Sequence, residues 1–120
     1  MSSKHILLVE DEALIALDIE TTLIEVGHRV SAVRTRSKAQ ALLDEEQFDL
    51  AIIDFHLPDG DSATLAQQLK EMGVPFIVCS GTAALSELGG VFADARFLAK
   101  PFSSDALLDT IVTVDTPSLH

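Results

Sequence analysis

Short apolar runs alternate with amphipathic segments along the whole chain. The runs lie at about residues 5–10, 29–34, 49–53, 75–79 and 95–99. The segments between them are longer and place apolar residues at the spacing of one helix face. This alternation predicts repeated βα units around one parallel sheet.

The composition of the runs predicts the order of the strands. Residues 30–33 read VSAV and alternate, whereas the first, third and fourth runs are continuously apolar. Parallel strands that are buried on both faces have continuous apolar sequences, so the second strand is expected at an edge. With right-handed crossovers, the expected fold is α/β, a doubly wound five-stranded parallel sheet of order 2-1-3-4-5.

The helices are predicted from their apolar faces and from the residues that can cap them. The second helix would open at a capping box of Ser37 and Gln40, and Asp61 or Ser62 would cap the third. Gly27 would end the first helix. The apolar face of that first helix would consist of Ala13, Leu14, Leu17, Leu23 and Ile24.

The segment from Gly81 to Ala93 fits the helical pattern least. Gly89 and Gly90 interrupt it, and each glycine costs about 1 kcal/mol relative to alanine inside a helix. We therefore expect a short or irregular fourth helix. Residues 115–120 are expected to form a flexible tail. Because a single domain commonly holds about 100–150 residues, residues 1–120 are expected to be one domain with no output domain.

The charge of the chain limits its partners. Lys and Arg total 8 and Asp and Glu total 19, which gives a formal net charge of −11. This charge repels nucleic-acid phosphates and anionic lipids, so we expect no nucleic-acid and no membrane partner. The apolar runs are too short to span a bilayer, and no signal-peptide pattern precedes Glu10, which predicts a cytoplasmic protein. Cys79 is the only cysteine and is interpreted as a buried structural thiol.

Polar side chains stand where the predicted strands end. Glu10 and Asp11 follow the first strand, Asp54 the third, Ser80 the fourth and Lys100 the fifth. Because the carboxyl ends of parallel strands share one edge, and the strand order reverses beside the first strand, these groups are expected in one crevice. Three carboxylates gathered there would repel one another, so a cation is needed if all stay ionised.

Mg²⁺ suits such a crevice because it prefers oxygen ligands and is often held by one or two carboxylates plus phosphate oxygens. We expect Asp11 and Asp54 as direct ligands, Glu10 as a partly water-mediated ligand, and the backbone carbonyl of His56 as a further oxygen. A carboxylate placed like Asp54 can act as a nucleophile that forms an acyl phosphate. Lys100 could then pair with an oxygen of the phosphoryl group.

Four motifs follow the strands in a fixed order: LVEDE at 8–12, DFHLPDG at 54–60, SG at 80–81 and KPF at 100–102. In these motifs and in its βα pattern the chain resembles the receiver domain of two-component response regulators. Together with the start of the first apolar run, the motifs span residues 6–102, nearly the whole chain. The resemblance implies a flavodoxin-like fold and a stand-alone receiver.

The resemblance also implies roles for the residues at the strand ends. Asp54 matches the phosphoacceptor that takes a phosphoryl group from the phosphohistidine of a sensor histidine kinase. Glu10 and Asp11 match the acidic pocket that binds Mg²⁺, or Mn²⁺ in its place. Lys100 matches the phosphate-pairing lysine, and Ser80 the hydroxyl residue that moves toward the phosphoryl group.

Phe97 matches the aromatic position that changes rotamer on activation. It replaces the more common Tyr, so it could report activation only by packing. Lys100-Pro101 matches a bond that is cis in the family. Ser62 stands where many receivers have Gly, and the interval between Ser80 and Lys100 is short.

What the resemblance implies is a phosphorylation-dependent switch that changes the surface around the fourth helix and regulates a partner. Two alternatives are a phosphorelay intermediate that serves a histidine phosphotransfer protein and a phosphate sink. In each case we expect a signalling protein and not an enzyme, whose only catalysis would be its own phosphotransfer and autodephosphorylation. We expect a monomer or a weak phosphorylation-dependent dimer.

Two other classes share parts of the pattern. Haloacid-dehalogenase-type phosphohydrolases also use a strand-end Asp with Mg²⁺, but they place a second Asp two residues later, where this chain has His56. A flavodoxin-like flavin binder would share the strand order. Its phosphate would meet Glu10, Asp11 and Glu12 after the first strand, and these would repel it.

Overall fold

The computed structural model describes residues 3–81, 92 and 95–115. In this part of the chain, one sheet of five parallel strands has the order β2-β1-β3-β6-β7. Counted in chain order, this is the predicted order 2-1-3-4-5, so the expected doubly wound fold is confirmed. The strands are β1 (His5–Val9), β2 (Arg29–Val33), β3 (Leu50–Asp54), β6 (Phe76–Ser80) and β7 (Arg96–Ala99).

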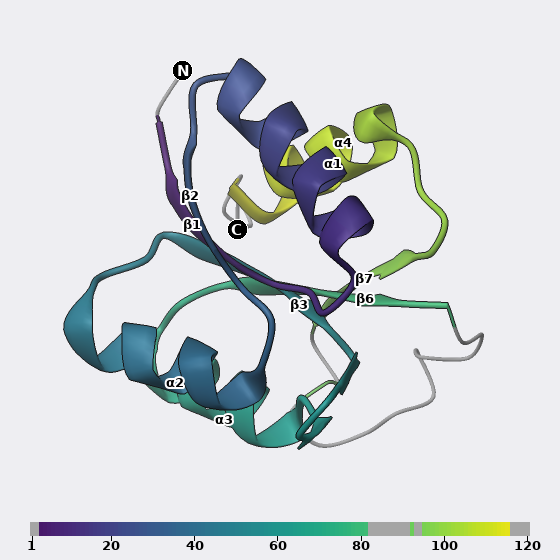
Figure 1. The fold of residues 1–120 in the computed structure, drawn as a ribbon. Coiled ribbons are helices and arrows are strands. Elements are labelled where there is room, and N and C mark those ends of the chain that lie inside the picture. Colours follow the sequence, from purple (N-terminus) through teal and green to yellow (C-terminus); the bar gives the residue numbers. More distant parts are fainter. Residues whose placement is uncertain (1–2, 82–91, 93–94, 116–120) are drawn as a thin grey trace.

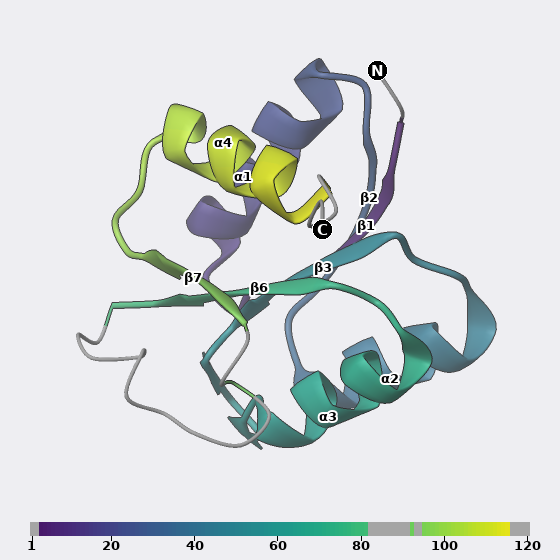
Figure 2. The same cartoon turned by 180° about the vertical axis from the view of Figure 1, so that it is seen from behind.

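The helices pack as two layers. Figure 1 shows α1 and α4 on one face of the sheet and α2 and α3 on the other, and Figure 2 shows the same layers from behind. The side chains of β1 divide between these layers: Ile6 and Leu8 join the core beneath α1 and α4, and Leu7 and Val9 join the core beneath α2 and α3. The helices are α1 (Ala13–Glu25), α2 (Arg36–Glu45), α3 (Ala63–Met72) and α4 (Ser104–Asp115).

Burial along the strands explains their order. Every residue of the central strand β3 is buried, while β2 has exposed residues and lies at an edge of the sheet. A strand covered by helices on both faces must be apolar on both sides, and an edge strand need not be. The contrast between continuous and alternating runs therefore located β2 correctly.

The predicted apolar face of α1 is wrong for four of its five residues. Ala13 is exposed, and Leu14, Leu17 and Ile24 have 82%, 59% and 53% of their surface open to solvent. The helix instead buries Ile19, Thr22 and Leu23. Most residues of α1 are apolar, so more than one face fits a helical spacing, and packing on the sheet decides which face is used.

The predicted start of α2 is also wrong. Its N-cap is Thr35, whose side chain accepts a hydrogen bond from the Lys38 amide at 3.2 Å. Ser37 lies inside the first turn and contacts Asp59 instead. Ser62 does precede α3, but its side chain makes no capping hydrogen bond. The first helix ends before Gly27, as expected.

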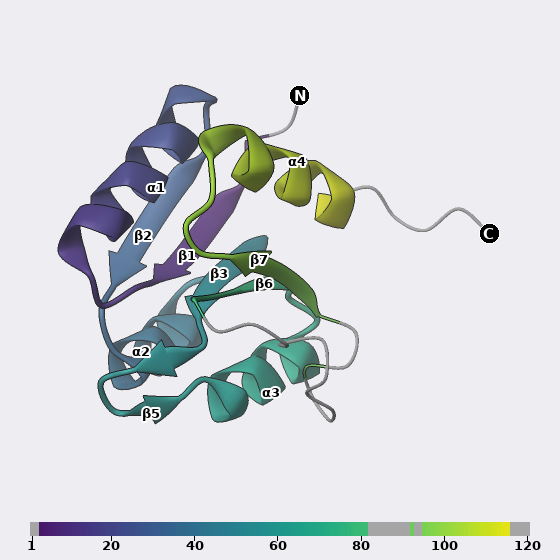
Figure 3. The same cartoon turned by 90° about the vertical axis from the view of Figure 1, so that its right-hand side faces the viewer.

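A small hairpin follows β3 directly. Its strands, β4 (His56–Leu57) and β5 (Gly60–Asp61), are antiparallel and enclose Pro58 and Asp59 at the turn. Figure 3 shows the hairpin beside α2 and α3, at the edge of the sheet where the parallel strands end. Gly60 has a φ of +126°, a backbone conformation that residues other than glycine rarely adopt.

Two expectations lie outside the described residues. The fourth helix was expected between Gly81 and Ala93, where only Gly81 and Phe92 are described. The flexible tail was expected at 115–120, of which only the backbone of Asp115 is described. Among the described helices, none has the length and apolar composition needed to cross a bilayer.

Candidate functional site

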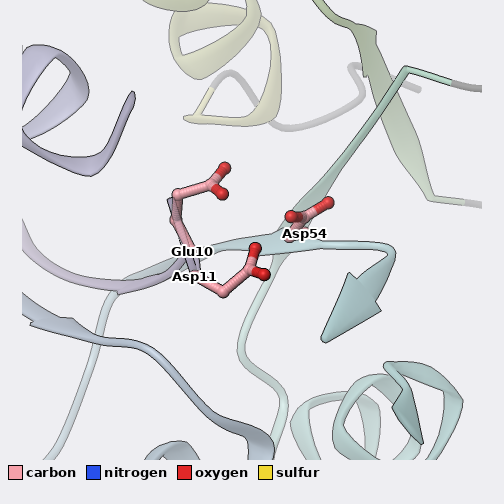
Figure 4. A group of neighbouring side chains, drawn as sticks. All are labelled: Glu10, Asp11 and Asp54. Carbon is pink, nitrogen blue, oxygen red and sulfur yellow. The ribbon is translucent and has the colours of Figure 1, made fainter. Parts of the chain in front are cut away.

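Three carboxylates meet at the carboxyl ends of β1 and β3. Glu10, Asp11 and Asp54 each offer an oxygen, and these oxygens lie within 4.8 Å of one another. Figure 4 shows the three side chains gathered around a common space. Glu10 and Asp54 are buried, with 2% and 8% exposed, and Asp11 is half-buried. The sequence-based expectation that these groups share one crevice agrees with their positions.

Lys100 lies between two of these carboxylates. Its Nζ is 2.8 Å from Glu10 Oε1 and donates to Asp54 Oδ2 at 3.1 Å. The lysine follows β7, and its amide donates to the Ser80 carbonyl at 2.9 Å, so β6 and β7 together fix its backbone. The Lys100-Pro101 peptide bond is cis, as the resemblance implied. The ammonium group of Lys100 therefore partly compensates the negative charge of the three carboxylates.

The pKa values of the site follow from burial and from these contacts. Burial, and after it the charge of Glu10, raise the pKa of Asp54, and Lys100 lowers it; the net result is a pKa of about 6. Burial alone would lower the pKa of Lys100, but the hydrogen bonds to Glu10 and Asp54 hold it above its ordinary value. The protein thus bears an electrostatic cost to keep Asp54 ionised, which a further cation at the cluster would reduce.

The His56 side chain is exposed, so the position of its backbone is what bears on the expected role of its carbonyl. The Ser62 amide donates to the Phe55 carbonyl at 3.1 Å, while the Phe55 amide donates to the Cys79 carbonyl at 2.8 Å. The bond from Ser62 to Phe55 flanks the next pair of the antiparallel ladder, His56 with Asp61, which is therefore a non-hydrogen-bonded pair. The His56 carbonyl consequently points away from β5, and His56 borders the same groove as Asp11 and Asp54.

Ser80 and Cys79 end β6 beside this cluster. Ser80 is buried, and β6 places it opposite Ala99, the residue before Lys100. Cys79 is buried opposite Asp54 in the sheet, and burial raises the pKa of its thiol to about 12. A thiol with this pKa stays protonated at neutral pH, which agrees with the interpretation of Cys79 as a structural residue.

Residues 6–112 match the family model of the response regulator receiver domain. The chain belongs to this family. Its members are signalling phosphoacceptors of two-component systems and are not enzymes in the usual sense. The resemblance drawn from the four motifs is therefore confirmed.

Individual relatives agree with this assignment. The receiver domain is 35% identical over 106 residues to the two-component response regulator PhoP of Pseudomonas aeruginosa, a match that covers 85% of this chain and 47% of that protein. The chain thus spans about half the length of the curated relatives it matches.

Solved receiver structures share the fold over almost the whole chain. The non-phosphorylated HemR receiver domain of Leptospira biflexa is 32% identical, with a TM-score of 0.83, and the match covers 97% of each chain. A CheY-like receiver domain protein of Methanospirillum hungatei is 28% identical, with a TM-score of 0.85 and 95% of each chain covered.

Phe97 lies outside the carboxylate cluster of this receiver. It is half-buried on β7 and packs against the core beneath α2 and α3. Its predicted role as an activation-linked rotamer switch stays a prediction.

A groove of about 840 Å³ opens beside the acidic cluster of the receiver. Of the residues that were expected in this crevice, Asp11, Asp54, His56 and Lys100 line the groove, whereas Glu10 and Ser80 are buried and do not line it. Sequence reasoning missed the apolar wall, which consists of Leu14, Ile15, Ile19, Pro101 and Phe102. No short motif marks that wall, because α1 and the segment after Lys100 meet only through the fold.

Proposed function

We propose that this receiver domain is a phosphorylation-dependent switch in which Asp54 accepts a phosphoryl group from the phosphohistidine of a sensor histidine kinase. The observation that carries the proposal is the position of Asp54. It is a buried carboxylate at a strand end, joined by Lys100 and gathered with Glu10 and Asp11. A buried nucleophile with a cation beside it is suited to phosphoryl transfer.

The residues present fit a divalent cation. Asp11 and Asp54 would be direct ligands, Glu10 a ligand through water, and the His56 carbonyl a further oxygen. Oxygen donors of this kind suit Mg²⁺, and Mn²⁺ accepts the same set. When bound, the ion supplies positive charge that neutralises the transferred phosphoryl group.

The transfer itself would use the residues already in contact. An oxygen of Asp54 attacks phosphorus, the bond from phosphorus to the kinase imidazole breaks, and an acyl phosphate forms on Asp54. In the structure, Lys100 Nζ forms ion pairs with Asp54 and Glu10. It would therefore be in reach of the new phosphoryl oxygens and would pair with one of them. Ser80 would donate its hydroxyl to another.

The phosphoryl group would change a surface that a downstream protein recognises, or would pass onward to a histidine phosphotransfer protein. The same chemistry on Asp54 would serve a relay or a phosphate sink. All three outputs depend on Asp54, so its phosphorylation is the first step to test. The net charge of −11 argues against direct contact with nucleic acid or membrane in any of these roles.

The test is to incubate the protein with Mg²⁺ and a small-molecule phosphodonor such as acetyl phosphate and to measure its intact mass. We expect one phosphoryl adduct that hydroxylamine removes, as it does an acyl phosphate. The adduct should be absent in Asp54→Asn. It should persist in the matched control Asp44→Asn, which makes the same change on the exposed side of α2.

The failed outcomes separate the alternatives. Steady turnover of phosphate esters without an accumulating adduct would favour a phosphohydrolase. An adduct that survives in Asp54→Asn would assign the phosphoacceptor to another residue. No adduct with any phosphodonor would contradict the proposal.

A further inference from the structure

A long-range contact fixes the tip of the β4–β5 hairpin. The carboxylate of Asp59 accepts hydrogen bonds from the Arg36 amide at 2.9 Å and from the Ser37 amide at 3.0 Å. It also accepts the Ser37 hydroxyl at 3.1 Å. The two amides are the first of α2, which have no acceptor within their own helix. A residue of the hairpin therefore completes the N-terminus of a helix more than 20 positions earlier in the sequence.

The contact is close as well as polar. The Arg36 side chain lies over Gly60, where an added Cβ would come within 3.0 Å of Arg36 Nη1. The hydrogen bonds, led by that from the Arg36 backbone, hold the pKa of Asp59 below its ordinary value. Asp59 is thus ionised at neutral pH, and its hydrogen bonds are of the stronger, charge-assisted kind.

The segment that receives Asp59 also touches the other wall of the acidic cluster. The Glu10 amide donates to the Val33 carbonyl at 3.1 Å, three residues before Arg36. The connection from β2 to α2 therefore contacts the end of β1, which bears Glu10 and Asp11, and the hairpin that bears His56. These are the two sides between which the cation would lie.

We propose that Asp59 is a positioning residue, which holds the His56 carbonyl at the metal site by fastening the hairpin to the N-terminus of α2. The inference rests on the proposed function, because it assigns a purpose to the hairpin only if Mg²⁺ binds at the cluster. Groups that orient metal ligands without touching the ion commonly change metal affinity when they are replaced.

The test measures Mg²⁺ affinity by amide chemical shifts or calorimetry, because the chain has no Trp or Tyr to report binding. Asp59→Ala removes all three hydrogen bonds and should weaken Mg²⁺ binding about tenfold. Because it also removes a negative charge, a second variant must weaken the contact and keep Asp59.

Arg36→Pro weakens the contact and keeps Asp59, because it removes the bond from the Arg36 amide and leaves the two bonds from Ser37. Proline lacks the amide hydrogen that Asp59 accepts, and it is favoured at the first position of a helix. The preceding residue, Thr35, has φ −132° and ψ 158°, the extended conformation that a following proline requires. This variant makes the protein more negative, so simple charge would strengthen Mg²⁺ binding, whereas loss of positioning should weaken it, by less than in Asp59→Ala because two of the three hydrogen bonds remain.

Thr35→Ala is the matched control. It removes the other hydrogen bond at the start of α2, to the Lys38 amide, and leaves the three bonds of Asp59 in place. It should lower thermal stability and leave Mg²⁺ affinity unchanged. Amide spectra of each variant establish that it is folded, and if Asp59→Ala does not fold, Arg36→Pro decides alone.

Three results would overturn the inference while the proposed function stands. In the first, both Asp59→Ala and Arg36→Pro bind Mg²⁺ like the wild type. In the second, Mg²⁺ binding is weaker only in Asp59→Ala, which would indicate a charge effect. In the third, Thr35→Ala weakens Mg²⁺ binding equally, which would indicate fraying of α2. If the wild type takes up a phosphoryl group and yet binds no Mg²⁺, the inference fails for want of a metal. If it takes up neither, the proposed function fails as well.

Discussion

Asp54 stabilises the protein less than a neutral residue of the same shape would. Its pKa of about 6, against an ordinary 3.8, means that the metal-free fold resists its ionisation, first by burial and then through Glu10. Lys100 does not remove this cost, because it is shared with Glu10 at 2.8 Å. The function that we propose for Asp54 therefore conflicts with stability, as is common where reactive groups are gathered.

We therefore predict that Asp54→Asn stabilises the metal-free protein at pH 7 by about 1–2 kcal/mol, after allowance for screening by solvent in the groove that the buried Asp54 borders. Between pH 3.8 and about 6 the native wild type keeps a proton that the unfolded chain has lost, so its stability falls as pH rises. The advantage of the variant should grow over that interval and level off above it. Denaturant unfolding without Mg²⁺ measures this, and a variant less stable than the wild type at pH 7 would contradict it.

At the scale of the element, α1 presents apolar residues on two sides. Leu23 is fully buried against the sheet, whereas Leu14 is 82% exposed at the edge of the groove. We predict that Leu23→Ala costs about 2–5 kcal/mol of unfolding free energy, and that Leu14→Ala changes it by about 0.5 kcal/mol or less. The two substitutions remove the same atoms from one helix. Equal losses in chemical denaturation would contradict the prediction, and a larger loss for Leu14→Ala would show that the helix packs by its other face.

The elements differ in how far the sequence could predict them. Each predicted strand lies within one residue of its observed bounds. The interior strands were predicted because a strand buried on both faces must be continuously apolar, and the edge strand β2 from its alternating pattern. The buried face of α1 could not be read, since its composition fits more than one face. The start of α2 was misplaced because Ser37 looks like a capping residue, while Asp59, distant in sequence, supplies the acceptor for its amide.

The candidate site, like the helices and strands, could be predicted only in part from the sequence. The meeting of Glu10, Asp11, Asp54 and Lys100 follows from topology, because parallel strands end at one edge. What topology does not give is the support of the site. The hydrogen bonds of Asp59 depend on how the hairpin packs on α2, which no local pattern records.

For the whole molecule, the acidic cluster is one part of a large negative charge. The net charge of −11 repels itself in the compact state, so any salt should stabilise the fold by screening. Mg²⁺ should do more than screen, because it would bind the native cluster and not the unfolded chain. The two effects can be separated by holding ionic strength constant.

We predict that replacing Na⁺ by Mg²⁺ at constant ionic strength raises the Tm of the wild type. At a concentration of 100 times Kd the gain is about 2.7 kcal/mol, which corresponds to about 10 °C for a domain of this size. Asp11→Asn removes an expected direct ligand and should lose most of this gain, while Asp44→Asn, which removes the same charge on α2, should keep it. NaCl should raise the Tm of all three proteins alike. If Asp11→Asn gained as much from Mg²⁺ as Asp44→Asn does, the ion would be acting on the total charge of the molecule and not at the ends of β1 and β3.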